Sequence, residues 1–211
     1  MKLYHYTLPE NCDQIMGRSI SATAANKKGL IPRTPFDGDK NNRVTYCLFD
    51  PVPGDWVNNK EFPGVFDSLM LSTDGFLLEI KVDLSDGGIF VLDWAILERI
   101  RRAEPYQFSD DEVDYARIDY HASKIPLSEY LQNPNLNYGL PEVVITKTIL
   151  PEMVAVSSEQ RMLEKHLEYI HRVAPIHSER NLQRYAVVPE LQPLIAEYEV
   201  RCPSNPEFKI A

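Results

Sequence analysis

Apolar and polar side chains alternate along several short segments of the chain, and this period of two residues predicts β-strands. The first segment is rich in tyrosine and has His5 at its centre, whereas the clearest one lies between Gly75 and Val82. The predicted strands cover residues 2–7, 43–49, 75–82, 89–93, 140–145 and 148–156. The turn Asp86-Gly87-Gly88 predicts that the third and fourth of these strands pair as a hairpin.

Helices are predicted where apolar residues recur every three or four positions and where caps, glycines or prolines mark the ends. The predicted helices cover residues 10–17, 94–102, 125–131 and 157–173, and a helical tail follows over 176–202. In the longest helix, Leu163 and Leu167 belong to an apolar face that we expect to pack on a sheet. Breaks in the tail are expected at Pro189 and Pro193.

Two longer segments follow neither period, and we predict that both are loops. Residues 27–42 contain two glycines and two prolines, and a loop of this length usually has a function or is mobile. Residues 104–115 include the acidic run from Asp110 to Asp114. This run lacks the regular ligand spacing and the closing glutamate of a calcium-binding loop, so we interpret it as solvated.

The order of these segments predicts an α+β fold. Short strands in pairs do not match regular βαβα alternation, and no GxGxxG, P-loop, HExxH or GxSxG motif is present in the sequence. We expect residues 1–156 to form an α+β domain and residues 157–211 to form a C-terminal helical extension packed on it.

The composition is that of an ordinary globular protein, since 44% of the 211 residues are apolar and 25% are charged. The net charge of −9 argues against a broad nucleic-acid-binding surface, because such surfaces neutralise phosphates with lysine and arginine. A local basic cluster, Arg99 with Arg101 and Arg102, is interpreted as a solvated helix face.

Cysteine usage and hydropathy indicate the compartment. Cys12, Cys47 and Cys202 are scattered and form no CxxC pair, so neither a disulfide framework nor a zinc knuckle is predicted. The sequence shows no apolar signal region and no run near the roughly 20 apolar residues that cross a bilayer. We expect a cytoplasmic protein without membrane contact, or one delivered to a target cell without a cleavable signal.

Three residues on separate predicted strands carry the main functional signal. The first strand contains Tyr4-His5-Tyr6-Thr7, the second contains Thr45-Tyr46-Cys47, and Glu142 follows a polar loop at the head of a third strand. The phrase Ile-Leu-Pro-Glu-Met-Val comes after it at residues 149–154. This order, over residues 3–156, resembles the His-Tyr-Glu branch of the ADP-ribosyltransferase superfamily, which includes proteins like diphtheria toxin and the PARPs.

The resemblance implies a fold of split antiparallel β-sheets flanked by helices. It also implies the activity of an NAD-dependent mono-ADP-ribosyltransferase, and a toxin or effector is one role that such an enzyme can have. Such an enzyme cleaves the bond between nicotinamide and ribose in NAD and transfers ADP-ribose to a macromolecular acceptor, with no metal. Glu142 would be catalytic, because a carboxylate at the ribose 2′-hydroxyl stabilises the positive charge of an oxocarbenium-like transition state.

The resemblance also implies a set of NAD-binding residues. His5 would hydrogen-bond the adenosine ribose, the backbone at Tyr6 would pair with the nicotinamide amide, and Tyr46 would stack on the nicotinamide ring. Thr7 completes the motif of the first strand. For the pyrophosphate we expect Arg33, with Lys27 or Lys28 as alternatives. If His5 faces a cleft, alternation along the strand predicts that Tyr4 and Tyr6 pack on the reverse side.

The sequence departs from the family at the second and third motifs. Thr45-Tyr46-Cys47 stands where many members have Ser-Thr-Ser, and Leu140 stands where members that modify arginine have the first glutamate of Glu-x-Glu. Arginine is therefore not supported as the acceptor. A protein side chain, a nucleic acid and a small molecule all stay open as acceptors.

Other readings of the chain stay open as well. One is a non-enzymatic interaction module, such as an immunity-type protein, that binds a partner through its C-terminal helices. Another is a pseudoenzyme that binds NAD without reacting. A cysteine nucleophile at Cys12 or Cys47 is disfavoured because no local signature surrounds either thiol. A metal site at His166 and His171 is disfavoured because five residues separate them, which does not align them on a helix face.

Overall fold

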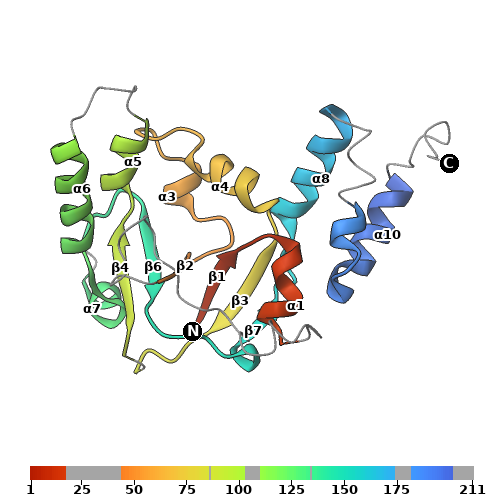
Figure 1. Cartoon of the computed structure of the whole chain (residues 1–211), viewed down its shortest axis with the longest axis horizontal. Coiled ribbons are helices and arrows are strands. Elements are labelled where there is room, and N and C mark those ends of the chain that lie inside the picture. Colours follow the sequence, from red (N-terminus) through yellow and green to blue (C-terminus); the bar gives the residue numbers. More distant parts are fainter. Residues whose placement is uncertain (18–43, 86, 103–109, 134, 174–181, 202–211) are drawn as a thin grey trace.

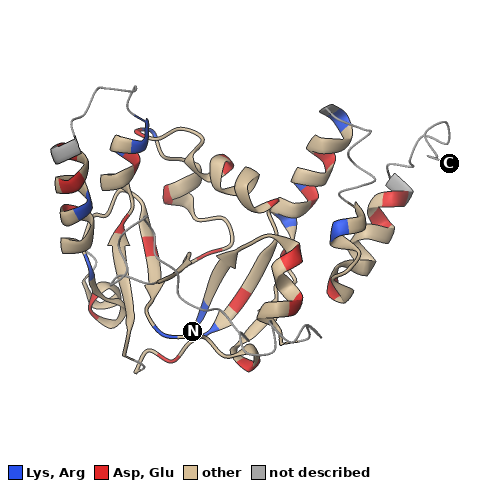
Figure 2. Ribbon diagram, viewed as in Figure 1, with Lys and Arg blue, Asp and Glu red and all other residues tan. Residues whose placement is uncertain are grey.

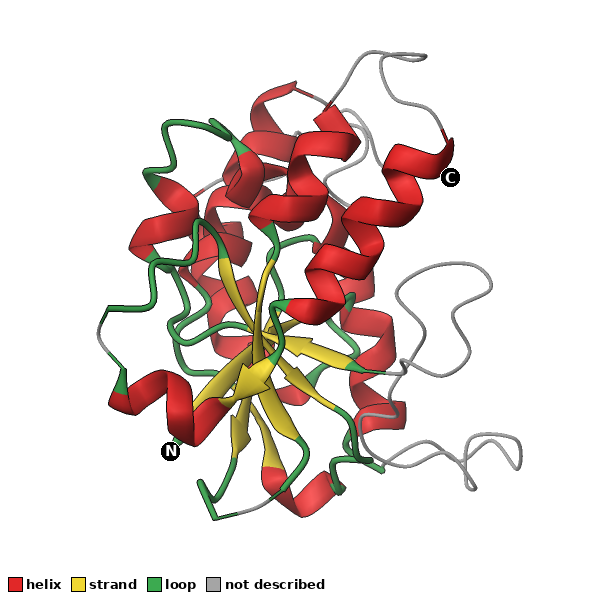
Figure 3. Ribbon diagram, turned by 90° about the vertical axis from the view of Figure 1, so that its left-hand side faces the viewer, coloured by secondary structure: helices red, strands yellow, loops and turns green. Residues whose placement is uncertain are grey.

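The computed structural model describes residues 1–17, 44–85, 87–102, 110–133, 135–173 and 182–201. It is an α+β structure with two antiparallel sheets flanked by helices (Figure 1). Seen from the side, the strands occupy the centre and helices surround them (Figure 3). The predicted α+β class is confirmed, as is the expectation of antiparallel sheets flanked by helices.

The first sheet has three strands in the order β1 (Lys2–Tyr6), β3 (Leu77–Lys81) and β7 (Val154–Val156). Its central strand alternates only weakly, since Leu77, Leu78 and Ile80 are all buried. Leu78 and Ile80 pack in the core shared with the C-terminal helices, whereas Leu77 packs on the opposite side with Phe66 and Met70, so apolar residues occupy both faces of this strand. In β1, His5 lies opposite Leu78.

The second sheet has four strands in the order β2 (Thr45–Cys47), β6 (Pro141–Ile145), β4 (Ile89–Asp93) and β5 (Ile125–Pro126). All five residues of β6 are buried, including Glu142. The sequence Pro-Glu-Val-Val-Ile thus places one ionisable group in a strand that is otherwise entirely apolar.

The two sheets meet edge to edge at β1 and β2. In the described part of the chain an antiparallel bridge joins them, in which Tyr4 donates its backbone N–H to the carbonyl of Leu48 over 3.0 Å and Leu48 donates back over 2.7 Å. Beyond this bridge the sheets spread apart (Figure 1), although His5 of β1 still contacts the backbone of Tyr46 of β2, which is 41 positions away in the chain.

The predicted hairpin between residues 75–82 and 89–93 is wrong. β3 pairs with β1 and β7 in the first sheet, whereas β4 pairs with β6 and β5 in the second. Gly88, which has a φ of 86°, turns the chain away from β3, and its carbonyl accepts the N–H of Thr146 over 2.9 Å. Long-range pairing with the more apolar β6 therefore prevails over the local turn.

Helices flank both sheets. Those of the first half are η1 (Pro9–Asn11), α1 (Cys12–Ile15), α3 (Gly54–Val57), α4 (Val65–Thr73) and α5 (Ala95–Arg102). Those of the second half are α6 (Asp110–Ala122), α7 (Leu127–Gln132), η2 (Pro151–Met153), α8 (Arg161–Val173), η3 (Pro189–Leu191) and α10 (Gln192–Arg201). Among these described helices, none is long and apolar enough to cross a membrane.

The prediction of a loop over residues 104–115 is wrong from Asp110 onward, because α6 begins at that residue. Acidic residues suit the first turn of a helix, where the backbone carries partial positive charge, so the same run is also typical of a helix start. The difference matters for the site, since α6 carries Tyr120, which is 1% exposed.

Further boundaries differ from the prediction, and one is the helix expected from residue 125, which begins at Leu127 because Ile125 and Pro126 pair with β4 as strand β5. The strand expected over 148–156 is interrupted by η2, since Pro151 cannot donate to a ladder. The helix expected from residue 157 begins at Arg161, because the side chain of Gln160 bonds both backbone groups of Leu77 and holds the chain extended. Pro193 lies in the first turn of α10, where proline is tolerated, and causes no break.

One hydrophobic core joins the first sheet to the C-terminal helices. Leu163 and Leu167 of α8 are buried in it together with Tyr198 of α10, against Leu3 and Leu78 of the sheet. The predicted apolar face of the long helix thus packs on the sheet. Because these side chains are at most 2% exposed, they are not available to a partner.

Candidate functional site

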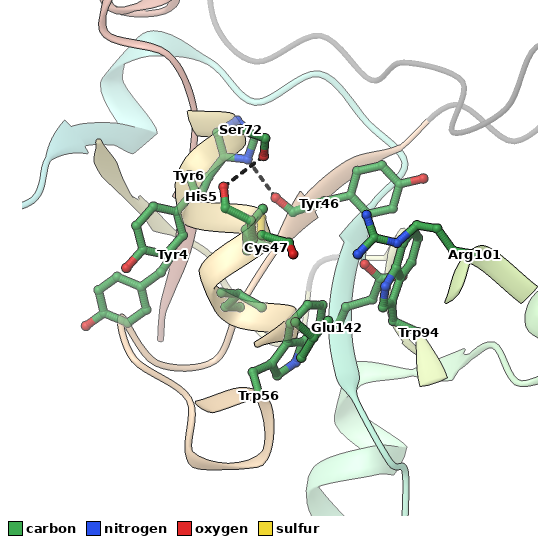
Figure 4. A pocket seen from close by; sticks show the side chains of 14 residues that line it. Tyr4, His5, Tyr6, Tyr46, Cys47, Trp56, Ser72, Trp94, Arg101 and Glu142 are labelled. Atoms are coloured by element: carbon green, nitrogen blue, oxygen red, sulfur yellow. Dashed lines mark hydrogen bonds between the residues drawn. The ribbon is translucent and has the colours of Figure 1, made fainter. Parts of the chain in front are cut away.

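A pocket of about 370 Å³ opens where the two sheets diverge, a volume within the range of roughly 300–1,000 Å³ typical of small-molecule sites. Its wall includes His5 and Tyr6 of β1, Tyr46 of β2 and Glu142 of β6 (Figure 4). Four of the residues singled out from the sequence therefore line one cavity.

His5 is held by the neighbouring sheet. Its Nδ1 lies 2.6 Å from the backbone carbonyl oxygen of Tyr46. Because a carbonyl oxygen only accepts hydrogen bonds, Nδ1 carries the proton in this contact, and in the neutral imidazole Nε2 is then an acceptor. The bond fixes both the ring orientation and the tautomer of His5, and it joins β1 to β2 beyond the bridge at Tyr4.

The expectation that Tyr4 and Tyr6 pack away from the cleft is wrong, since both line the pocket together with His5. β1 is the edge strand of its sheet, so the cavity beside that edge receives side chains from both faces of the strand. The Tyr6 ring packs edge-on against Phe66 of α4, with 5.9 Å between centroids, and its hydroxyl donates to the carbonyl of Pro51.

An aromatic cluster surrounds Tyr46. The indole of Trp94, which also lines the pocket, lies edge-on to Tyr46 at 6.5 Å and to Tyr120 at 6.1 Å between ring centroids. Edge-to-face packing of this kind stabilises the rings beyond the area that they bury. Trp94 and Tyr120 were not singled out from the sequence, because their contribution depends on α5 and α6 packing against the second sheet.

Glu142 is 4% exposed, and the hydroxyl of Tyr120 donates a hydrogen bond to its Oε1. Burial raises the pKa of Glu142 to about 8, and the charge of Asp93 adds to the rise, while the bond from Tyr120 acts in the opposite direction. The group is thus mostly protonated at neutral pH in the unliganded site. Titratable groups with such shifts are concentrated at functional sites.

A second carboxylate organises the basic end of α5. Glu98 is 0% exposed and accepts hydrogen bonds from the Trp94 indole, from Arg101 and from Arg102. The guanidinium of Arg101 lines the pocket near Trp94 (Figure 4), and the basic end of α5 is blue in Figure 2. The interpretation of this cluster as a plain solvated helix face is therefore wrong for Arg101 and Arg102. The i, i+3 and i, i+4 spacing from Glu98 was the available signal.

One of the expected binding residues, Thr7, is not among the described residues of the pocket wall. Thr7 is 8% exposed and accepts a hydrogen bond from the Asn11 side chain over 3.0 Å, so its hydroxyl belongs to the junction between β1 and η1. Arg33, like Lys27 and Lys28, lies outside the described residues.

The cysteines and histidines have structural surroundings. Cys12 and Cys47 are free and buried, and burial raises the pKa of the Cys47 thiol well above its usual range, which disfavours a thiolate nucleophile. His166 lies 3.4 Å from the carboxylate of Asp74, and the His171 ring packs edge-on against Tyr198. The two histidines thus contact different elements.

The chain was compared with protein-family models, with curated proteins and with solved structures, and it matches none of them. The geometry of the pocket and the chemistry of the residues that line it are therefore the basis for inferring a function.

Proposed function

We propose that the protein is an NAD-dependent mono-ADP-ribosyltransferase with the split-sheet fold of that superfamily, acting on a macromolecular acceptor as a toxin or effector. One observation carries the proposal: His5, Tyr46 and Glu142, which are up to 137 positions apart in the sequence, line the same pocket between two antiparallel sheets. Such a convergence of polar groups with a perturbed pKa is typical of a binding or active site.

The residue chemistry supports distinct roles along the pocket. The Nε2 acceptor of His5 suits a ribose hydroxyl, and the aromatic rings of Tyr46 and Trp94 offer surfaces for the flat nicotinamide ring. Glu142 would accept the ribose 2′-hydroxyl. As the C–N glycosidic bond breaks, its electron pair goes to nicotinamide, and the carboxylate stabilises the positive charge that develops on the sugar. The acceptor then bonds to the ribose carbon and loses a proton.

The raised pKa of Glu142 fits this role once the ligand is considered. The nicotinamide ring of NAD is positively charged, and a nearby positive charge favours the ionised form of a carboxyl group. Binding of NAD would thus expel a proton from Glu142 near neutral pH. The charge-stabilising carboxylate would then exist only in the complex, which keeps a costly buried charge out of the empty site.

The first test is incubation with NAD, with measurement of nicotinamide release and of calorimetric binding in buffers of different ionisation enthalpy. The wild-type protein should bind NAD with proton release at pH 7 and should release nicotinamide. Glu142→Gln should keep the fold, bind without proton release, and lose at least about a hundredfold in turnover, the usual loss when one key stabilising group is removed. A folded wild-type protein that binds no NAD contradicts the proposal, and undiminished turnover in the variant contradicts the role of Glu142.

A pseudoenzyme that binds NAD without reacting is the second candidate. The burial of Glu142 and the nearby charge of Asp93 favour it, because both raise the pKa of Glu142 and a carboxyl that stays protonated cannot stabilise an oxocarbenium ion. NAD binding without proton release and without nicotinamide release would identify this case.

A further inference from the structure

Arg101 is the cation of the pocket. Among the described residues of its wall, no other lysine or arginine is present. The Arg101 side chain is 52% exposed, so its guanidinium meets both the cavity and solvent. The fold places this positive charge on α5, at the opposite side of the pocket from β1 (Figure 4).

The orientation of Arg101 is fixed by Glu98. Nε of Arg101 donates to one carboxylate oxygen over 2.8 Å, and NH2 donates to the other over 2.9 Å. Glu98 is itself fully buried and is held by the Trp94 indole over 3.0 Å. A guanidinium held in this bidentate way has lost most of its rotamer freedom before any ligand arrives, which lowers the entropic cost of binding.

The charge balance leaves Arg101 able to bind an anion. Glu98 supplies one negative charge to two guanidinium groups, those of Arg101 and Arg102, so the cluster keeps a net positive charge. Arg102 also donates a hydrogen bond from NH1 to the backbone carbonyl of Pro63 over 2.9 Å. Within the described part of the chain, NH1 of Arg101 donates to no such acceptor.

We propose that Arg101 binds a phosphate group of the ligand through the edge of the guanidinium that carries NH1. The inference rests on the proposed function, in which the anion is the diphosphate of NAD, and it assigns the diphosphate contact to α5. A planar fork with free N–H donors matches phosphate oxygens, and Glu98 acts as the positioning residue for Arg101.

Arg101→Gln and the matched control Arg102→Gln distinguish recognition from structure, because both residues bond Glu98 but only Arg101 lines the pocket. Calorimetric affinities should be measured for ADP-ribose and for nicotinamide, with melting curves to verify folding. We expect Arg101→Gln to weaken ADP-ribose binding about tenfold or more while nicotinamide binding stays unchanged. Arg102→Gln should change ADP-ribose binding by less than about twofold.

Equal loss of ADP-ribose binding in both variants, or no loss in Arg101→Gln, overturns the inference. The conservative variant Arg101→Lys, which keeps the charge but not the fork, should recover part of the affinity. If the wild-type protein binds ADP-ribose in an Arg101-dependent way but releases no nicotinamide from NAD, the inference stands and the transferase proposal fails. If neither NAD nor ADP-ribose binds, inorganic pyrophosphate is the probe: binding lost only in Arg101→Gln supports the inference, and no binding overturns it.

Discussion

The ionisation of Glu142 is decided by its burial and by two neighbouring side chains from other elements. Burial in β6 and the charge of Asp93 on β4 favour the neutral acid, whereas the hydroxyl of Tyr120 on α6 favours the carboxylate. Arg101 lines the same pocket from α5, and Cys47 of β2 is close enough for the charge of Glu142 to raise the pKa of its thiol. In the proposed enzyme, Tyr120 is thus a positioning residue for Glu142 that does not itself line the pocket.

Tyr120→Phe removes the donor that stabilises the Glu142 carboxylate. Since the pKa of Glu142 is about 8 in the wild-type site, kcat/KM for nicotinamide release should rise with pH through that region. Loss of the hydrogen bond should move the rising part of the pH–rate profile about one pH unit upward, and it should lower kcat/KM at pH 7 by about tenfold. The measurement is a pH–rate profile of each protein.

Tyr138→Phe is the matched control for Tyr120→Phe. The Tyr138 hydroxyl also donates to a group near the end of α6, the carbonyl of Ser123, and it has no bond to Glu142. Its pH–rate profile should keep the wild-type midpoint. If the midpoints of the pH–rate profiles shift equally in both variants, the hydroxyl of Tyr120 acts only by supporting α6.

At the scale of elements, the connection from α4 to β3 depends on a close approach to α8. Gly75 has a φ of 72°, and a Cβ at this position would lie 2.7 Å from the backbone carbon of Met162 and 2.8 Å from the backbone nitrogen of Leu163. Only glycine satisfies both the backbone conformation and the contact. The preceding residue, Asp74, is also left-handed, with a φ of 54°.

Gly75→Ala should therefore lower the free energy of unfolding by about 2 kcal/mol or more, because it combines left-handed strain with a clash against backbone atoms that cannot rotate away. Gly87→Ala is the control, since a Cβ there meets nothing within 4 Å, and it should change stability by less than about 0.5 kcal/mol. Urea unfolding of both variants measures the difference. Equal stabilities would mean that α8 shifts to admit the methyl group.

For the whole molecule, a cluster of charges links the C-terminal region to the N-terminal part of the chain. Arg184 donates to both carboxylate oxygens of Glu10 over 2.8 Å and lies 3.2 Å from Asp74, which is 9% exposed. His166 of α8 approaches the same carboxylate, and burial lowers the pKa of its imidazole. Segments from both ends of the sequence thus meet beside the start of β3.

Asp74→Asn keeps the shape and suits the left-handed backbone, so it isolates the charge of Asp74. Because Arg184 loses a nearly buried charged partner, the free energy of unfolding measured in urea should fall by about 1–3 kcal/mol. Amide hydrogen exchange should increase most in residues 182–201. Asp114→Asn is the control. Its pair with Arg117 is exposed on both sides, so stability should stay within about 0.5 kcal/mol. Equal effects of the two variants would contradict a docking role for the cluster.

The residues proposed for the site could be named from the sequence because each lies in a short, distinctive local phrase. His5 is flanked by tyrosines in an alternating strand, and Glu142 interrupts an apolar one. Trp94, Glu98 and Arg101 could not be found in this way. Their spacing is that of any helix with i, i+3 and i, i+4 pairs, and only packing reveals that the helix end faces the pocket.

The sequence by itself determined the period of the longer strands and of α8, the α+β class, and the apolar character of β6, because these depend on interactions between near neighbours and on local burial patterns. The tertiary structure alone decided that β3 and β4 belong to different sheets, that Tyr4 and Tyr6 share the pocket with His5, and that Glu142 is buried against Tyr120. Pairing between distant strands is selected by the free energy of the whole core. No local turn or alternation encodes that choice.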